Sequence, residues 1–193
     1  MCLAQTLSVL NGNFPTKKEV AVISFSGGES TLSADIAEEV GVELAEISQE
    51  TKDKLKQYIP AYASAKNPLD ATTTLFHEDE KTVGVLKSFN DDPAVGLITV
   101  GVNVKKDDDL TTSDMCKSIA HAKELGVTKP VVAIPSLEGY RYRGSRRILE
   151  DAGVPLMSSM GTSFTALKKL LDFADYDYKE HNLESCVPKD HEG

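Results

Sequence analysis

Three times along the chain, a stretch with helical hydrophobic spacing ends in a glycine that leads into a β-branched apolar run. These glycines are Gly41, Gly126 and Gly153, and a valine follows each of them directly. A glycine that closes a helix in the left-handed conformation before a strand is typical of α/β domains. Because the arrangement recurs, it predicts alternating helices and strands independently of residue propensity.

The apolar runs that we expect to be strands are short, with room for a crossover between them. They are residues 20–25, 42–47, 95–102, 131–134 and 154–157. The first is apolar throughout apart from Ser24, which suits a strand covered by helices on both faces. The expected helices are residues 30–40, 49–58, 78–89, 111–125, 138–152 and 163–173. Right-handed crossovers then predict an α/β fold, a flavodoxin-like three-layer α/β/α arrangement with an open, mainly parallel sheet.

The length of 193 residues and a hydrophobic share of 40% fit one globular domain. We expect a lead-in helix and connector over residues 1–18, the flavodoxin-like domain over 19–176 and a polar tail or linker over 177–193. The first residues have neither the basic flank nor the cleavage site of a signal peptide. These features predict a cytoplasmic protein.

The formal net charge of -9 argues against partners that need clustered positive charge on the protein. We therefore expect no nucleic-acid partner, and no apolar run is long enough to predict a membrane span. The three cysteines, Cys2, Cys116 and Cys186, lie too far apart to suggest a disulfide framework or a C-x-x-C metal site. No metal site is predicted.

The stretch F-S-G-G-E-S, residues 25–30, joins an expected strand to an expected helix, at the edge of a parallel sheet where ligands bind. Two glycines leave no Cβ to block a ligand, and the following helix offers unpaired N–H groups. We predict a phosphate-binding site formed by Ser26, Gly27, Gly28, Glu29 and Ser30. A plain turn with Ser26 or Ser30 as helix N-cap is the alternative. The pattern is neither a Walker A loop nor G-x-G-x-x-G, so it predicts no nucleotide site.

A second polar stretch is A-K-N-P-L-D-A-T-T-T, residues 65–74, in which Pro68 argues against both helix and regular strand pairing. We expect a shaped loop here. Asn67 and Asp70 either order that loop through hydrogen bonds to the backbone or lie beside the two glycines and contact the same ligand. They are the second choice of ligand-binding residues.

The runs V-A-V-I-S-F-S-G-G-E-S-T-L-S-A-D-I-A-E-E-V-G-V-E-L-A, S-Q-E-T-K-D-K-L and I-P-A-Y-A-S-A-K-N-P-L-D, in this order, resemble the NDP-forming acyl-CoA synthetases. This family includes the ADP-forming acetyl-CoA synthetases and is related to succinyl-CoA synthetase. The resemblance extends from about residue 3 to residue 176. It implies that the chain is the flavodoxin-like CoA-ligase domain of such an enzyme.

The family reaction joins a carboxylic acid to CoA at the expense of a nucleoside triphosphate, through an acyl phosphate and a phosphohistidine. By resemblance, the helix that begins near Glu29 is one of two whose N-termini face the phosphohistidine. CoA, ATP or ADP and Mg2+ serve the whole enzyme, and none is expected on this domain itself. The implied partners are the phosphohistidine/CoA-binding and ATP-grasp domains, fused or as subunits, and a small carboxylic acid; a homo-oligomer is compatible with this assignment.

Two departures from the family pattern matter. Many acetyl-CoA-forming members carry G-G-P where this chain has Gly27-Gly28-Glu29, which leaves the acid open. A carboxylate beside a phosphate is unfavourable unless it points away, caps an N–H group or is offset by a cation. The catalytic histidine of the family lies in a His-Thr-Gly-like setting, which none of the four histidines shares: His77, His121, His181 and His191. We expect solvated or structural roles for them, no catalytic residue, and an inactive isolated chain.

The remaining clusters have simpler explanations. Four arginines lie within residues 141–147, and we expect Arg146 and Arg147 to pair with Glu150 or Asp151, or else to dock against another domain. The acidic run at 107–114 is expected to complement a helix dipole rather than to hold Mg2+. A non-catalytic module that senses an anion or docks a partner is the alternative function. A flavin-binding flavodoxin is disfavoured, because the loop lacks a Thr/Ser-rich phosphate cradle.

Overall fold

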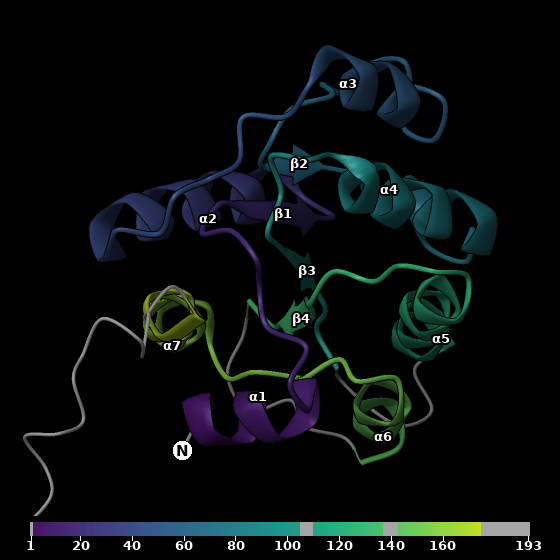
Figure 1. The fold of residues 1–193 in the computed structure, drawn as a ribbon. Coiled ribbons are helices and arrows are strands. Elements are labelled where there is room, and N and C mark those ends of the chain that lie inside the picture. The colour runs from purple at the N-terminus through teal and green to yellow at the C-terminus, as the bar shows by residue number, and fades with distance from the viewer. Residues whose placement is uncertain (1, 105–109, 137–142, 175–193) are drawn as a thin grey trace, which may run out of the picture.

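The computed structural model describes residues 2–104, 110–136 and 143–174 (Figure 1). Four strands form one sheet in which every pairing is parallel, with the order β2-β1-β3-β4. They are β1 (Val20–Ser24), β2 (Leu69–Asp70), β3 (Leu97–Gly101) and β4 (Val131–Ile134). The expected flavodoxin-like α/β fold with an open parallel sheet is confirmed.

The helices within the described residues are α1 (Cys2–Leu10), α2 (Gly27–Val40), α3 (Gln49–Leu55), the 3-10 helix η1 (Thr73–Leu75), α4 (Asp79–Asp91), α5 (Leu110–Glu124), α6 (Arg143–Asp151) and α7 (Met160–Ala174). Gly41 ends α2 with φ +74°, and its N–H donates to the carbonyls of Ala37 and Glu38. Gly126 and Gly153 also have positive φ. The three glycine–valine junctions are therefore helix ends, as the sequence predicted.

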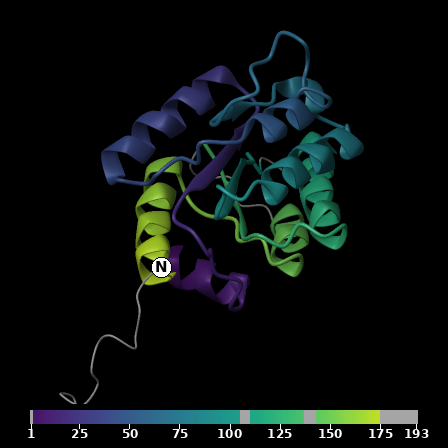
Figure 2. The ribbon, with the colours of Figure 1, turned by 45° about the horizontal axis from the view of Figure 1, so that its top comes forward.

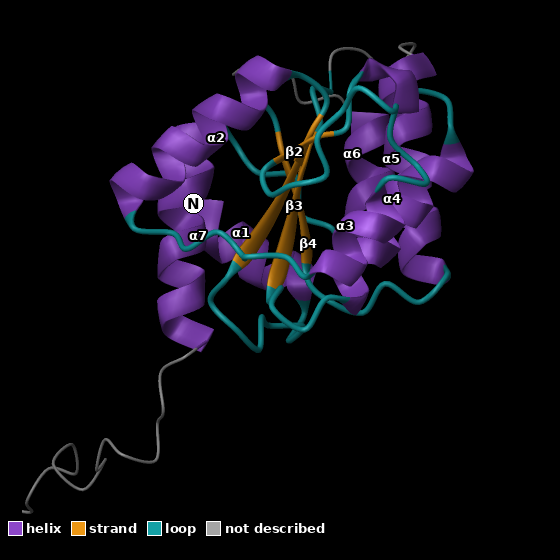
Figure 3. Ribbon diagram, turned by 90° about the horizontal axis from the view of Figure 1, so that it is seen from above, coloured by secondary structure: helices purple, strands orange, loops and turns teal. Residues whose placement is uncertain are grey.

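Helices cover both faces of the sheet (Figures 2 and 3): α1, α2 and α7 lie on one face, and α3 to α6 lie on the other. Val20 and Val22 of β1 point into the first layer, whereas Ala21 and Ile23 point into the second. All five residues of β1 are buried. Burial on both faces explains why this strand is apolar without alternation.

The two expected strands at 42–47 and 154–157 are wrong as full strands. Leu44 makes a single parallel bridge with Val20, and Leu156 makes one with Ala133, so each segment touches an edge of the sheet without continuing along it. The pairing of β2 was not expected. Proline lacks only its own N–H group, so parallel pairing resumes directly after Pro68.

One side chain completes the edge of β1 between the bridge at Leu44 and β2. Asn67 Nδ2 donates to the carbonyls of Val20 (2.8 Å) and Ala45 (3.0 Å), and the Val22 N–H donates to Asn67 Oδ1 (2.8 Å). The amide thus takes the place of a strand residue at this edge. The segment from residue 42 cannot continue along β1, because this side chain already occupies the next hydrogen-bonding position.

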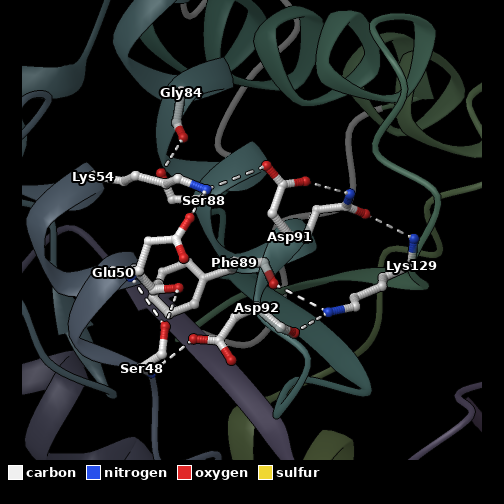
Figure 4. A network of polar contacts seen from close by, with 11 residues as sticks. Ser48, Glu50, Lys54, Gly84, Ser88, Phe89, Asp91, Asp92 and Lys129 are labelled. Atoms are coloured by element: carbon white, nitrogen blue, oxygen red, sulfur yellow. Dashed lines mark hydrogen bonds and ion pairs between the residues drawn. The ribbon is translucent and has the colours of Figure 1, made fainter.

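A polar network holds the C-terminal end of α4 against two neighbouring segments (Figure 4). The Lys129 ammonium donates to the carbonyls of Phe89 and Asp92. Asp92 is only 1% exposed, and its carboxylate accepts hydrogen bonds from the amides of Ser48 (2.8 Å) and Ala94 (2.9 Å). Burial by itself would raise the pKa of Asp92, but the hydrogen bonds from the Thr51 hydroxyl and these amides outweigh it and hold the pKa below its usual value.

Asn67→Ala should lower the free energy of unfolding by about 2–4 kcal/mol, because it removes three hydrogen bonds at the edge of β1, among them the one that the Val22 N–H donates. Urea unfolding followed by circular dichroism measures the change. Asn13→Ala is the matched control, since Asn13 donates one hydrogen bond to the Thr128 carbonyl at an exposed position. Equal stability of the two variants would contradict this account of the β1 edge.

Asp92→Asn should lower the free energy of unfolding at pH 7 by about 1–3 kcal/mol, because an amide nitrogen then faces a backbone donor. The lowered pKa of Asp92 means that the ionised carboxylate stabilises the fold above about pH 4. This contribution is lost as the pH falls through the pKa of the folded state. The difference between variant and unchanged protein should therefore shrink from pH 7 toward pH 3 in urea titrations.

Asp91→Asn is the control for that titration, since Asp91 is the exposed neighbour and its loss should change stability by less than about 0.5 kcal/mol. A loss at Asp92 that stays constant with pH would refute the assignment of an ionised, hydrogen-bonded carboxylate.

Candidate functional site

The N-terminus of α2 carries the five residues predicted to bind phosphate. Ser26 is the N-cap, with an extended backbone, and its hydroxyl accepts a hydrogen bond from the Glu29 N–H (3.3 Å). Gly27 and Gly28 are the first two helical residues, so α2 begins three residues before the expected start at 30 and slightly before Glu29. The glycine-containing turn that the sequence predicts between strand and helix is therefore the first turn of α2. Ser30 lies inside the helix, where it is buried.

The two glycines leave this helix end uncovered. Both are exposed; a Cβ on Gly28 would meet no atom within 4 Å, and one on Gly27 would lie 3.4 Å from Asp70 Oδ2. The N–H groups of a first helical turn have no acceptor within the helix. The geometry thus supplies side-chain-free N–H donors at the positive end of a helix dipole.

A pocket of about 420 Å³ opens beside this helix end. It lies at the carboxyl ends of β1 and β3, where α2 leaves toward one face of the sheet and α5 lies on the other. This is a topological switch point, the position at which open parallel sheets bind ligands. The pocket is lined by Phe25, Ser26, Glu29, Thr73, Phe76, Gly101, Val102, Asn103, Thr111, Thr112 and Met115.

The Glu29 side chain turns across the ends of the strands. Glu29 Oε1 accepts hydrogen bonds from Ser136 Oγ (2.5 Å) and Asn103 Nδ2 (3.2 Å), and the Ser136 N–H donates to Asn103 Oδ1 (3.0 Å). These contacts tie together the segments that follow β1, β3 and β4. The carboxylate stays at the wall of the pocket, so it brings a negative charge to the site.

Sequence reasoning missed Asn103 and Ser136. A signal was present, because both are polar residues that closely follow an expected strand, at 95–102 and at 131–134. Side chains in such positions meet at the carboxyl edge of a parallel sheet.

The two second-choice ligand residues, Asn67 and Asp70, have different positions relative to the pocket. Asn67 is used by the edge of β1 and does not line the pocket. Asp70 Oδ1 accepts a hydrogen bond from the Thr72 N–H (3.0 Å), while its other oxygen lies near Gly27. Both residues therefore order the loop through the backbone, and only Asp70 lies beside the first turn of α2.

His77 follows Phe76, a lining residue of the pocket, in the chain and contacts a second lining residue. Its Nδ1 is 2.8 Å from Asp114 Oδ2, and its Nε2 is 3.3 Å from the hydroxyl of Thr111, which lines the pocket. The hydrogen bond from His77, followed by that from Lys117, lowers the pKa of Asp114. His77 and Asp114 are 37 residues apart in the chain, so the sequence pattern did not predict that they would be in contact.

The backbone around His77 is strained. The φ angles of Thr72 and His77 are +62° and +65°, a region that costs a non-glycine residue on the order of 1–3 kcal/mol. Such strain is common where a loop serves a ligand site.

Cys116 and the arginines at 146 and 147, which the sequence analysis considered, do not line this pocket. Burial raises the pKa of Cys116 to about 12, so its thiol is not a nucleophile at neutral pH. Arg146 pairs with Glu150 (2.8 Å) and Arg147 with Asp151 (3.5 Å), as expected. His181, His191 and residues 107–109 and 141–142 lie outside the described residues.

Within the described ranges, no three His, Cys, Asp or Glu side chains gather closely enough to hold a metal ion. The same residues include no helix with the length and apolar character that a membrane span requires.

The family profile described as "Ligase-CoA domain" matches residues 20–142. The alpha subunit of acetate–CoA ligase [ADP-forming] II of Pyrococcus furiosus is 29% identical over 142 residues, which are 73% of this chain and 30% of that subunit. Acetate–CoA ligase [ADP-forming] I of Archaeoglobus fulgidus is 39% identical over 165 residues, or 86% of this chain and 22% of the relative. The chain thus spans less than a third of the length of either relative.

The crystal structure of PH0766 from Pyrococcus horikoshii OT3 has a similar fold, with a TM-score of 0.73. The similarity covers 88% of this chain and 40% of the other, at 24% sequence identity. At this identity the comparison shows the fold alone.

Proposed function

We propose, because the chain belongs to the Ligase-CoA domain family, that it serves as the CoA-ligase domain of an NDP-forming acyl-CoA synthetase. The complete enzyme would convert a carboxylic acid, CoA and a nucleoside triphosphate into acyl-CoA, nucleoside diphosphate and phosphate. The named activities of the relatives from Pyrococcus furiosus and Archaeoglobus fulgidus support this reaction class. The reaction would pass through an acyl phosphate and a phosphohistidine on another domain.

The role of this domain would be electrostatic. The uncovered first turn of α2 at the switch-point pocket is the observation that carries the proposal. A phosphoryl group placed there gains hydrogen bonds from the N–H groups of Gly27 and Gly28 and the favourable end of the helix dipole. Such preorganised donors stabilise a transferring phosphoryl group most where water is excluded.

We assign the remaining parts of the machinery to partner domains, since this chain spans only a fraction of its relatives. The phosphohistidine/CoA-binding unit and the ATP-grasp unit, with ATP or ADP and Mg2+, would be fused to the chain or be separate subunits. Residues 19–176 would form the domain, with residues 1–18 as a lead-in and 177–193 as a linker. An enzyme that depends on CoA and nucleotide would work in the cytoplasm.

In the complete enzyme, Gly28→Val should slow phosphorylation of the catalytic histidine on the order of a hundredfold, because the side chain blocks access to the helix N–H donors. The fold should persist, since a Cβ on Gly28 meets no neighbour. Phosphoenzyme formation from radiolabelled ATP, followed by rapid quench, measures the rate, and thermal unfolding checks the fold.

Gly161→Val is the matched control, because Gly161 is also the second residue of an exposed helix start, that of α7, and a Cβ there meets no neighbour. Its rate should stay within about twofold of the unchanged enzyme. An unaltered rate in Gly28→Val would rule out the proposed role. The rival function, a non-catalytic anion-sensing or docking module, would be supported if the chain occurred without any histidine-bearing partner domain.

A further inference from the structure

The pocket beside α2 carries an unbalanced charge. The Glu29 carboxylate lies in its wall, and neither lysine nor arginine is present among the described residues that line it. A phosphoryl group entering this space would meet a like charge, which is unfavourable unless a cation lies close by. The contacts of Glu29 with Ser136 and Asn103 are hydrogen bonds from neutral groups, so they do not cancel its charge.

We infer that His77, in its protonated form and together with Thr111, binds the phosphoryl group on the α5 side of this pocket. The inference rests on the proposed function and adds a cation to the described part of the site. Thr111 belongs to the pocket wall, as does Phe76, which precedes His77 in the chain. His77 is not itself a lining residue, but it adjoins Phe76 in the chain and contacts Thr111, and about half of its side chain is exposed.

The hydrogen bonds of His77 make this role possible. Asp114 Oδ2 lies 2.8 Å from Nδ1 and accepts a hydrogen bond from the Nδ1–H group, which leaves Nε2 near Thr111 Oγ1 at 3.3 Å. In the neutral imidazole, Nε2 can only accept a hydrogen bond from Thr111. After protonation Nε2 becomes a donor, so imidazolium and hydroxyl can both donate to an incoming anion.

Several charged groups surround this imidazole. Asp114 is shared, because Lys117 Nζ approaches its other oxygen at 3.3 Å. Other charged side chains on the adjacent elements include Glu78, Asp79, Glu80 and Lys81 at the start of α4, Asp70 in β2, and Glu29 in α2 across the pocket. Lys81 is paired to Glu78 at 3.4 Å, and Asp79 is paired to His121. Most of these charged groups are acidic.

A second histidine provides a control within the same two helices. His121 of α5 pairs with Asp79 of α4 through Nδ1 at 2.7 Å, and its side chain is similarly exposed. It faces a different groove, between α3, α4 and α5, and does not line the pocket at α2. Loss of His121 thus removes a second histidine with an aspartate partner without touching the proposed site.

The test is a sulfate titration of the 193-residue chain, observed by NMR through the ring signals of His77 and the amide signals of Gly28 and Glu29. Sulfate is the probe because its charge stays constant across the range in which histidine titrates, with sodium chloride added to hold the ionic strength equal. At about pH 6, where histidine is largely protonated, both sets of signals should shift with one dissociation constant. His77→Gln should weaken binding at least about threefold, and His121→Gln should leave it unchanged.

The pH supplies a further readout, because histidine side chains change charge between about pH 5 and 8. The difference between unchanged protein and His77→Gln should therefore disappear at the upper end of this range. Equal sulfate affinity of the unchanged protein and His77→Gln at about pH 6 would overturn the inference. Sulfate-induced shifts confined to the His77 ring, or confined to the Gly28 and Glu29 amides, would also overturn it, as would a His121→Gln variant that binds sulfate as weakly as His77→Gln. These outcomes do not decide the role of α2, which rests on the phosphoenzyme rate of Gly28→Val in the complete enzyme.

Discussion

Complete burial of β1 is the constraint on which the rest of the structure depends. A buried strand must pair all of its backbone N–H and C=O groups within the protein. On one side β3 provides a regular parallel ladder. On the other side the pairing is divided among three short pieces, which are the bridge at Leu44, the side-chain amide of Asn67 and the two residues of β2. This shared edge fixes where β1 ends, and with it the place where α2 begins.

The candidate site follows from that strand end. Since α2 and α5 lie on opposite faces, a pocket opens between them at the carboxyl ends of β1 and β3. Two opposite electrostatic features meet there, the positive end of the α2 dipole and the Glu29 carboxylate. Binding of a phosphoryl anion in this pocket depends on whether the attraction of the helix dipole exceeds the repulsion of the Glu29 carboxylate. His77, which contacts Thr111 of the pocket wall, is the side chain that we propose to contribute to this balance.

The sequence predicted those features that depend on local pattern. The glycine–valine junctions at Gly41, Gly126 and Gly153 marked helix ends correctly, and the strand at 131–134 matches β4. The expected helix at 30–40 began three residues late, because two glycines disfavour a helix by propensity. The alternative in which Ser26 is the N-cap is the arrangement that the structure shows.

The remaining features depend on contacts between distant residues. Edge pairing at 42–47 is cut short by the side chain of Asn67, which lies 22 positions beyond Ala45. The meeting of Glu29, Asn103 and Ser136, and that of His77 with Asp114, arise only when the strands have assembled. Periodicity and spacing carry no information on such pairs, although polar residues just after strands identify the edge at which they gather.

The most direct test of the central claim is a structure of the complete enzyme with its catalytic histidine phosphorylated. The account predicts phosphoryl oxygens at about 2.7–3.1 Å from backbone N–H groups in the first turn of α2, with Gly28 facing the phosphorus. A phosphohistidine bound elsewhere, with this helix end still open to solvent, would contradict it.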